Sequence, residues 1–200
     1  MKNKKVPPLH KEHLALNRFG VNTILREFAM WTIVALLLFL VGGDVTWLNT
    51  WIFLGWKLCF STIYTLSMIK WNVELLNIRG RPTKALRSGH MREYDKIFFV
   101  FYTPLFILFP IIVGLEYRLL PGSSLPCWLV LVGLFFIILG DSIFGWAIVV
   151  NRFFHGIVKI QTDRGHSVVS SGPYKYVRHP GYLGQILYYL GFPVLFESKW

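Results

Sequence analysis

Long apolar stretches separated by short polar segments dominate this chain. Four of them, at residues 28–43, 47–69, 97–115 and 127–150, approach the roughly 20 residues that a helix needs to cross a bilayer core. A fifth stretch, at 182–196, is too short to span well. The pattern predicts an all-α membrane protein, a polytopic bundle with four to five transmembrane helices.

Two of the predicted spans contain a charged residue, and a third contains prolines. Because a charge in lipid is costly, we expect Lys57 to face other helices or to extend toward the interface. Asp141 is either a functional intramembrane acid or a hydrogen-bonding partner of a neighbouring helix, and the sequence leaves both open. Pro104 and Pro110 predict kinks in the span at 97–115.

The composition agrees with a membrane protein and bears on its partners. Hydrophobic residues make up 54% of the chain and charged residues 16%, against roughly 25% in soluble domains. The net charge of +11 resides mostly in segments between the apolar stretches. Anionic lipid headgroups, or an anionic group on a substrate or cofactor, therefore explain it better than nucleic acid does.

The distribution of lysine and arginine predicts an orientation. Their number alternates along the chain: six in 1–27, none in 43–46, seven in 70–96, one in 116–126 and five in 151–181. By the positive-inside rule, the N-terminus and both long loops are then cytoplasmic. For the 70–96 loop this topological signal is a sufficient explanation. No small-residue cleavage site follows the first apolar stretch, so we expect a retained helix rather than a signal peptide.

The last loop contains an unusual concentration of rigid, cationic and aromatic residues in "GPYKYVRHPGYLG", at 172–184. Arg178, and less directly Lys175, can hold a carboxylate or a phosphate. Glycines allow a close approach of the backbone, and histidines can exchange hydrogen bonds near neutral pH. Tyrosine rings offer faces for a base or a cation, although tyrosines beside a membrane are often interfacial anchors. The residues alone predict a cytoplasmic ligand pocket.

Metal binding is not expected. The histidines at 155, 166 and 179 lack an i, i+4 pair or an accompanying cysteine. Cys59 and Cys127 form no metal-ligand spacing, and their apolar surroundings predict small buried hydrophobic residues.

The stretch "HSVVSSGPYKYVRHPGYLG" resembles the signature of the isoprenylcysteine carboxyl methyltransferase family, and residues 151–193 resemble its prokaryotic branch in particular. This resemblance covers about a fifth of the chain. It implies an integral-membrane enzyme that uses S-adenosylmethionine and methylates a lipid-like acceptor. The implied organisation is a basic N-terminal segment at 1–27, a four-helix transmembrane region at 28–150, and a cofactor-binding motif with the start of a further membrane helix at 151–200.

The resemblance also implies which residues line the cofactor site. A polar residue before the predicted turn at residues 162–166 contributes to the site, and either Lys159 or Gln161 fits that position. The other residues implied by the resemblance are His166, Ser167, Val168, Val169, Tyr174, His179, Pro180, Gly181 and Tyr182. Arg178 is added as a candidate because it can hold an anionic group. The implied reaction is direct displacement, in which a carboxylate acceptor needs no base. No catalytic residue is assigned.

The family pattern continues with a further membrane helix and a polar tail bearing an arginine and glutamates, whereas this sequence stops at "LFESKW". We therefore expect a C-terminally truncated member. Two alternatives remain open. One is an NADPH-dependent membrane reductase related to the sterol reductases, which have a similar "RHP" motif but are usually much longer. The other is a non-catalytic membrane fragment.

Overall fold

The structure is a computed structural model, and it describes residues 15–81, 93–120, 125–154 and 167–198, apart from the side chains of 93–99, 101–103 and 105. The described part is helical and contains no strand. Its elements are α1 (Arg18–Gly42), α2 (Leu48–Trp71), α3 (Val73–Arg79), α5 (Glu93–Leu119), α6 (Cys127–Val150), the 3₁₀ helix η2 (Gly172–Lys175) and α7 (Pro180–Leu195).

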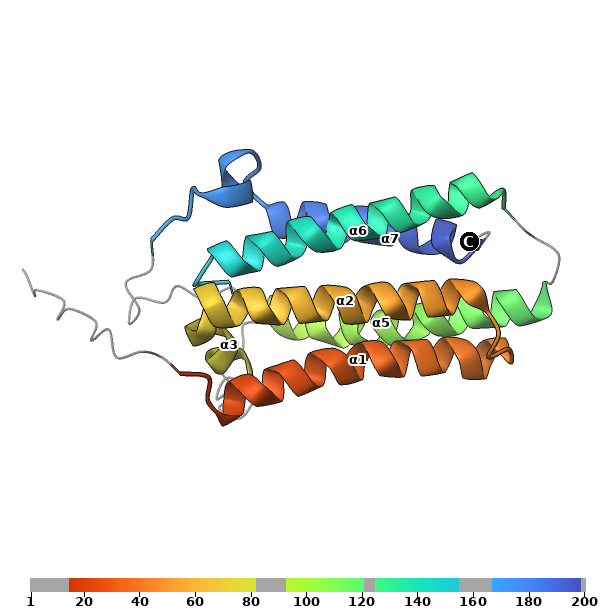
Figure 1. Cartoon of the computed structure of the whole chain (residues 1–200), viewed down its shortest axis with the longest axis horizontal. Coiled ribbons are helices and arrows are strands. Elements are labelled where there is room, and N and C mark those ends of the chain that lie inside the picture. Colours follow the sequence, from red (N-terminus) through yellow and green to blue (C-terminus); the bar gives the residue numbers. More distant parts are fainter. Residues whose placement is uncertain (1–14, 82–92, 121–124, 155–166, 199–200) are drawn as a thin grey trace, which may run out of the picture.

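The long helices lie side by side in one bundle (Figure 1). Helix α7 runs along α6, α2 lies between α6 and α1, and α5 packs on α1. The short helices α3 and η2 both lie at the end of the bundle where α2 ends (Figure 1). We call this the α3 end. The prediction of an all-α membrane bundle is confirmed.

Three of the described helices, α1, α2 and α6, are long and apolar enough to cross a membrane. The predicted span at 97–115 lies within α5, which continues through Pro104 and Pro110. Helix α7 has 16 residues and is about 24 Å long, which is shorter than the bilayer core of about 30 Å. A total of four to five spans stays a prediction.

Helix α1 begins well before the apolar stretch at 28–43. The side chain of Asn17 caps it by accepting hydrogen bonds from the backbone nitrogens of Phe19 and Gly20, at 2.9 and 3.2 Å. Hydropathy marks the part of a helix that can face lipid, whereas a cap marks the place where the helix begins. The polar first turns of α1 were therefore missing from the prediction.

Glycines bring α6 and α7 into backbone contact. A Cβ atom on Gly140 would lie 2.5 Å from the carbonyl oxygen of Gly184, and one on Gly184 would lie 2.6 Å from the carbonyl oxygen of Gly140. The pair Gly133 and Gly191 repeats this arrangement two turns away, with a Cβ on Gly191 reaching the Gly133 oxygen at 2.5 Å. Small residues at these four positions let the helices approach closely.

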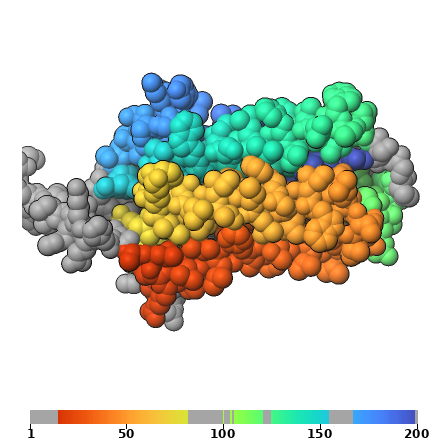
Figure 2. Space-filling model, in the orientation of Figure 1, coloured from red at the N-terminus to blue at the C-terminus, as the bar shows by residue number. Residues whose placement is uncertain are grey.

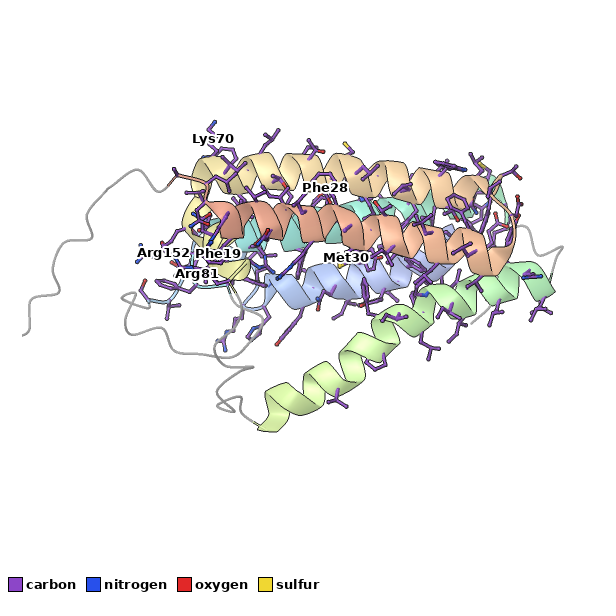
Figure 3. All side chains as sticks on the ribbon, turned by 90° about the horizontal axis from the view of Figure 1, so that it is seen from below. Phe19, Phe28, Met30, Lys70, Arg81 and Arg152 are labelled. Carbon is purple, nitrogen blue, oxygen red and sulfur yellow. The ribbon has the colours of Figure 1, made fainter. Side chains whose placement is uncertain are left out.

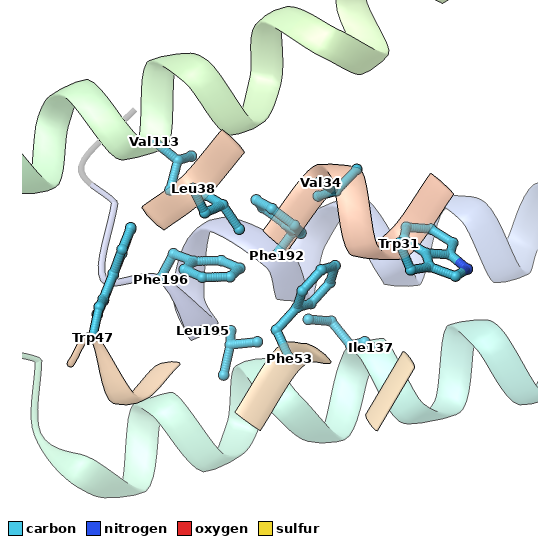
Figure 4. Packing of buried hydrophobic residues seen from close by; sticks show 10 residues of the cluster. All are labelled: Trp31, Val34, Leu38, Trp47, Phe53, Val113, Ile137, Phe192, Leu195 and Phe196. Atoms are coloured by element: carbon cyan, nitrogen blue, oxygen red, sulfur yellow. The ribbon is translucent and has the colours of Figure 1, made fainter. Parts of the chain in front are cut away.

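Aromatic rings fill the centre of the bundle away from the α3 end (Figure 4). Phe53 of α2 meets the ring of Phe192 of α7 at 5.4 Å and the ring of Trp31 of α1 at 6.0 Å, both nearly edge to face. Five helices contribute to this core cluster. Its buried members are Trp31, Val34, Leu38, Trp47, Phe53, Val113, Ile137, Phe192, Leu195 and Phe196.

Helix α5 is inclined to the other long helices, and its first turns diverge from the bundle (Figure 3). Phe109 joins it to α7 through ring contacts with Tyr189 at 6.0 Å and Phe192 at 4.8 Å. Contacts with the core thus come from the middle and the later turns of α5.

Basic residues from separate segments gather at the α3 end, where Lys70, Arg81 and Arg152 all lie (Figure 3). These residues belong to two of the loops that the charge count places in the cytoplasm. Because these residues lie at the same end of the bundle, both loops belong on the same face of the membrane. That this face is the cytoplasmic one stays a prediction.

The expectation for the two cysteines was wrong, because Cys59 and Cys127 are both exposed on the bundle. An apolar neighbourhood in sequence does not separate a side chain that faces the protein core from one that faces lipid.

The outer surface of α1, α2 and α6 is continuous, and the segment that follows residue 166 projects beyond α6 (Figure 2).

Gly140→Leu is predicted to destabilise the bundle, because its side chain would meet the backbone of α7 rather than a movable side chain. Overpacking of this kind costs about 1–3 kcal/mol or more. Thermal unfolding in detergent micelles measures the loss. Gly55→Leu is the matched control, since a Cβ there meets nothing within 4 Å. Equal melting temperatures for the two variants would contradict the α6–α7 contact.

Candidate functional site

A buried ion pair joins α2 and α6 in the middle of the bundle. The Nζ atom of Lys57 lies 2.7 Å and 2.8 Å from the two carboxylate oxygens of Asp141, and the Lys57 side chain is fully buried. Trp56 Nε1 donates a third hydrogen bond to Asp141 Oδ2 at 2.8 Å. Lys57 therefore faces other helices, as one reading of the sequence predicted. Asp141 is the hydrogen-bonding partner of a neighbouring helix.

Two aromatic rings complete the surroundings of the Lys57 ammonium. Its nitrogen lies 3.9 Å from the ring centroid of Trp31 and 4.1 Å from that of Tyr188. Both distances are within the range of cation–π attraction, which grows stronger away from water. The cation thus connects α1, α2, α6 and α7 through one atom.

A cavity of about 390 Å³ lies beside this ion pair, between the core cluster and the α3 end. The volume lies within the range of about 300–1,000 Å³ that is usual for small-molecule sites. Each of the six α-helices in the described residues contributes to its wall, which is mostly apolar and aromatic. The lining residues are Glu27, Met30, Trp31, Phe60, Tyr64, Arg79, Phe106, Gly140, Asp141, Phe144, Ile148, Gly184, Gln185, Tyr188 and Tyr189.

Two further charged side chains line this cavity. Glu27 Oε1 accepts a hydrogen bond from Trp31 Nε1 at 3.1 Å. Arg79 Nη1 donates to the hydroxyl oxygen of Tyr64 at 2.8 Å. Both charged residues are half-buried. The cavity wall therefore carries an anionic and a cationic side chain, both within electrostatic range of the Tyr64 hydroxyl, in a lining that is otherwise mostly rings and aliphatic groups.

Helix α3 places Arg79 at the cavity through tight packing against the start of α1. The Asn77 side chain accepts from the backbone nitrogen of Asn17 at 3.0 Å and donates to the Ala15 carbonyl at 3.1 Å. A Cβ atom on Gly80 would lie 1.7 Å from the carbonyl oxygen of Phe19. Only glycine fits this contact, and it fixes the end of α3 against α1.

The predicted cofactor residues lie outside this cavity, on and around the loop before α7. Lys159, Gln161 and His166 fall outside the described residues. Ser167 and Val168 are exposed, Val168 to 93%, and Val169 is half-buried. An exposed valine has no packing role in the described part of the fold, so its side chain is free to contact a ligand.

Tyr174 is anchored beneath this loop. Its hydroxyl oxygen accepts a hydrogen bond from Asn151 Nδ2 at 3.0 Å. Burial raises the pKa of the Tyr174 hydroxyl, and the Asn151 hydrogen bond partly opposes that rise. Gly172 has a positive φ of 58° that glycine adopts without strain, and it lies against Trp146. The loop is thus held to the end of α6.

The remaining candidates surround the start of α7. Arg178, His179 and Tyr182 are exposed, whereas Pro180 and Gly181 are buried. The rings of His179 and Tyr182 lie 5.6 Å apart with an interplanar angle of 28°. The structure therefore brings a cation, a histidine and a tyrosine together on one exposed surface.

Helix α7 links this exposed surface to the cavity. It begins at Pro180, and Gly184 and Gln185, about one turn further along, already line the cavity. Sequence reasoning identified the motif but missed Glu27 and Arg79. Arg79 was counted only among the basic residues of the 70–96 loop and Glu27 was given no role, and only their packing shows that both line a cavity.

A second cavity of about 560 Å³ lies at the opposite end of the bundle. Its acids already accept hydrogen bonds: Glu197 from Asn49 Nδ2 and from the Leu125 nitrogen, and Glu116 from the Ser198 hydroxyl. Asp44 accepts from Thr46 and from the Tyr117 hydroxyl, and these hydrogen bonds lower the pKa of its carboxyl group. The Glu197 and Ser198 contacts fasten the residues after α7 to neighbouring segments, and the Asp44 contacts join the α1–α2 connection to α5.

Comparison with known proteins supports the resemblance. The model of the isoprenylcysteine carboxyl methyltransferase family matches residues 131–200, and confirms the predicted family resemblance over that segment. This segment contains most of α6, the connection between α6 and α7 at residues 151–179, and α7. We call this connection the motif loop. No solved structure matches the chain significantly.

Curated plant proteins match part of the chain. Protein-S-isoprenylcysteine O-methyltransferase A of Arabidopsis thaliana is 35% identical over 81 residues, which are 40% of this chain and 41% of that protein. The B protein of the same plant is 34% identical over 76 residues, or 38% and 39% of the two chains. A probable protein-S-isoprenylcysteine O-methyltransferase of Oryza sativa subsp. japonica is 34% identical over 65 residues, or 32% and 34%. The matches thus span about two-fifths or less of each relative.

Lys57→Met is predicted to destabilise the bundle by about 3–5 kcal/mol, because it leaves Asp141 as a buried charge without its counter-ion. The double variant Lys57→Met with Asp141→Asn removes both charges and keeps an acceptor for Trp56 Nε1. We expect it to regain most of the lost stability in thermal unfolding experiments in detergent. A double variant that melts lower than Lys57→Met alone would contradict this account.

Proposed function

Because residues 131–200 match the model of the isoprenylcysteine carboxyl methyltransferase family, we propose that the chain is a membrane methyltransferase that uses S-adenosylmethionine. Its acceptor is a lipid-like molecule, and the methylated group is a carboxylate. The observation that carries the proposal is the coincidence of the family match with a helix that joins the motif loop to a charged, aromatic cavity.

The exposed residues around the start of α7 suit the cofactor. His179, Tyr182 and Val168 present ring faces and an apolar group that the described contacts of the fold leave accessible. Arg178 offers donors for a carboxylate. In this proposal Lys159 or Gln161, with His166 and Ser167, completes the polar part of the site, and Val169, Tyr174, Pro180 and Gly181 shape its wall.

The chain's own contribution to catalysis is position and exclusion of water. Bound S-adenosylmethionine would supply an electrophilic methyl group, which passes to a carboxylate oxygen as the carbon–sulfur bond breaks. A carboxylate is ionised near neutral pH, so the chain needs no general base for this acceptor. The aromatic wall of the cavity keeps the acceptor away from bulk water, where hydration would weaken its nucleophilicity.

The cavity of about 390 Å³ beside the Lys57–Asp141 ion pair is the proposed acceptor site. Its apolar wall suits a hydrocarbon tail, and Gly184 and Gln185 bring it within about one turn of the cofactor residues. The plant relatives are named for S-isoprenylcysteine, so a prenylated cysteine is the acceptor that we propose to test first. The names of these relatives favour methyl transfer over reduction by NADPH.

The orientation follows the positive-inside rule. We place the α3 end, with its basic residues and the motif loop, on the cytoplasmic face, where a soluble cofactor is available. The acceptor would then reach the cavity from the membrane, while the cofactor would arrive from the cytoplasm.

His179→Ala and Tyr174→Ala are each predicted to weaken binding of S-adenosylhomocysteine by about tenfold or more, which corresponds to about 1.4 kcal/mol. The first variant removes an exposed ring, and the second removes the anchor of the loop to Asn151. Isothermal titration of the detergent-solubilised chain measures the affinity. Lys70→Ala is the control, because Lys70 lies at the same end of the bundle on α2.

The same titration discriminates between the functions under consideration. We expect saturable binding of S-adenosylhomocysteine and none of NADPH, followed by transfer of a labelled methyl group to a prenylcysteine. Binding of NADPH alone would favour the reductase. Binding of neither ligand would contradict a cofactor site in this chain.

A further inference from the structure

We propose that the cavity recognises an amphiphile whose polar end carries both an ammonium group and an anionic group. Glu27 binds the ammonium and Arg79 binds the anion. The inference rests on the proposed function only in taking this cavity as the acceptor site. It goes further because the relatives' names describe a cysteine within a protein, whose nitrogen is an amide, whereas this cavity suggests an acceptor with a free ammonium group.

The four charged residues of the cavity region differ in how they are compensated. Lys57 and Asp141 form the only ion pair that the structure records among its described residues, with a closest approach of 2.7 Å. Glu27 has a neutral donor, the Trp31 indole nitrogen, as its hydrogen-bonding partner. Arg79 has a neutral acceptor, the Tyr64 hydroxyl. Among the described residues, these two half-buried charges of opposite sign have no ion-pair partner within 4.0 Å, and Glu27 feels the Lys57 charge only at longer range.

This arrangement leaves the charges of Glu27 and Arg79 only partly compensated in the absence of a ligand. A charge held away from water loses hydration that a neutral hydrogen-bonding partner replaces only in part. The cost increases toward the membrane interior, where ionisable residues commonly mark binding sites. A ligand with both charges would compensate Glu27 and Arg79 together, whereas a ligand with one charge would leave the other uncompensated.

The two charged side chains are held in place before a ligand binds. The Trp31 ring that donates to Glu27 is itself packed on the Lys57 ammonium at 3.9 Å. Tyr64, which accepts from Arg79, is buried and packs in the cluster with Met68, Leu75 and Ile148. A site with fixed partners loses less conformational entropy on binding, which favours affinity and selectivity.

The rest of the cavity accommodates the hydrocarbon part of such a ligand. Met30, Phe60, Phe106 and Phe144 contribute apolar and aromatic lining. Arg79 is at the end of α3, and Glu27 lies just before the first apolar stretch, so the polar end of the ligand would sit near the membrane surface. A polar end near the membrane surface and a largely apolar lining together suit an amphiphile.

Three ligands with the same tail test the proposal. S-farnesylcysteine has a free ammonium and a free carboxylate, its N-acetyl derivative keeps only the carboxylate, and its methyl ester keeps only the ammonium. We expect the detergent-solubilised full chain to bind the zwitterion about tenfold more tightly than either derivative, since each derivative lacks one charge-assisted hydrogen bond. Equal affinities for all three ligands would overturn the proposal.

Matched variants assign each charge to its residue. Glu27→Gln keeps an acceptor for Trp31 and should abolish the preference for S-farnesylcysteine over its N-acetyl derivative, while the preference over the methyl ester remains. Arg79→Gln should abolish the preference over the methyl ester, while the preference over the N-acetyl derivative remains. Arg79→Lys should restore part of the preference over the methyl ester. Loss of both preferences in both variants, with unchanged melting temperatures, would contradict the assignment of one charge to each residue.

Two further measurements separate this inference from the proposed function. Binding of S-adenosylhomocysteine should be unchanged in Glu27→Gln and Arg79→Gln, and a tenfold loss there would mean that the two charges serve the cofactor instead. Competition by phosphatidylethanolamine in mixed micelles, but not by phosphatidylglycerol, would support the zwitterionic chemistry and identify a lipid as its source. Selective binding without methyl transfer would overturn the enzymatic proposal and leave this one intact.

Discussion

The buried ion pair between Lys57 and Asp141 is the constraint on which the rest of the bundle depends. An ammonium group in the middle of an apolar bundle needs a counter-ion, and the carboxylate that supplies it here lies on another helix. This requirement fixes the register of α2 against α6. The rings of Trp31 and Tyr188 then add α1 and α7 to the same cation. Four helices are aligned by one charge, and the cavity forms beside it.

The glycine contacts extend this alignment to the motif loop. Because α7 touches α6 through backbone atoms at Gly140 and Gly184, α7 cannot slide without a clash. Its first residue, Pro180, belongs to the motif, so the exposed surface of His179 and Tyr182 has a fixed position relative to the cavity. A methyl donor and an acceptor bound at the two places would be held at a defined separation, which is the main requirement of a displacement reaction.

Much of this could be predicted from the sequence, because membrane segments and family motifs are local patterns. The apolar stretches predicted the long helices, and the cost of a charge in lipid predicted that Lys57 faces protein. The pairing of Lys57 with Asp141 required knowledge of which faces of α2 and α6 meet. The exposure of Cys59 and Cys127 was mispredicted for a related reason, since lipid-facing and core-facing residues are equally apolar. Arg79 was counted only as a basic loop residue and Glu27 was not considered, because tight packing around Asn77 and Gly80, which directs the end of α3 toward the cavity, is not a local pattern.

The cavity thus contains charges in two different states. Lys57 and Asp141 satisfy each other and would resist any ligand, because displacing either would uncover a buried charge. Glu27 and Arg79 hold neutral partners that orient them and leave their charges available. Stability and recognition therefore rest on different residues within one site. We therefore expect a substitution at Glu27 or Arg79 to alter ligand preference with little effect on the stability of the bundle, whereas removing one partner of the ion pair destabilises the bundle.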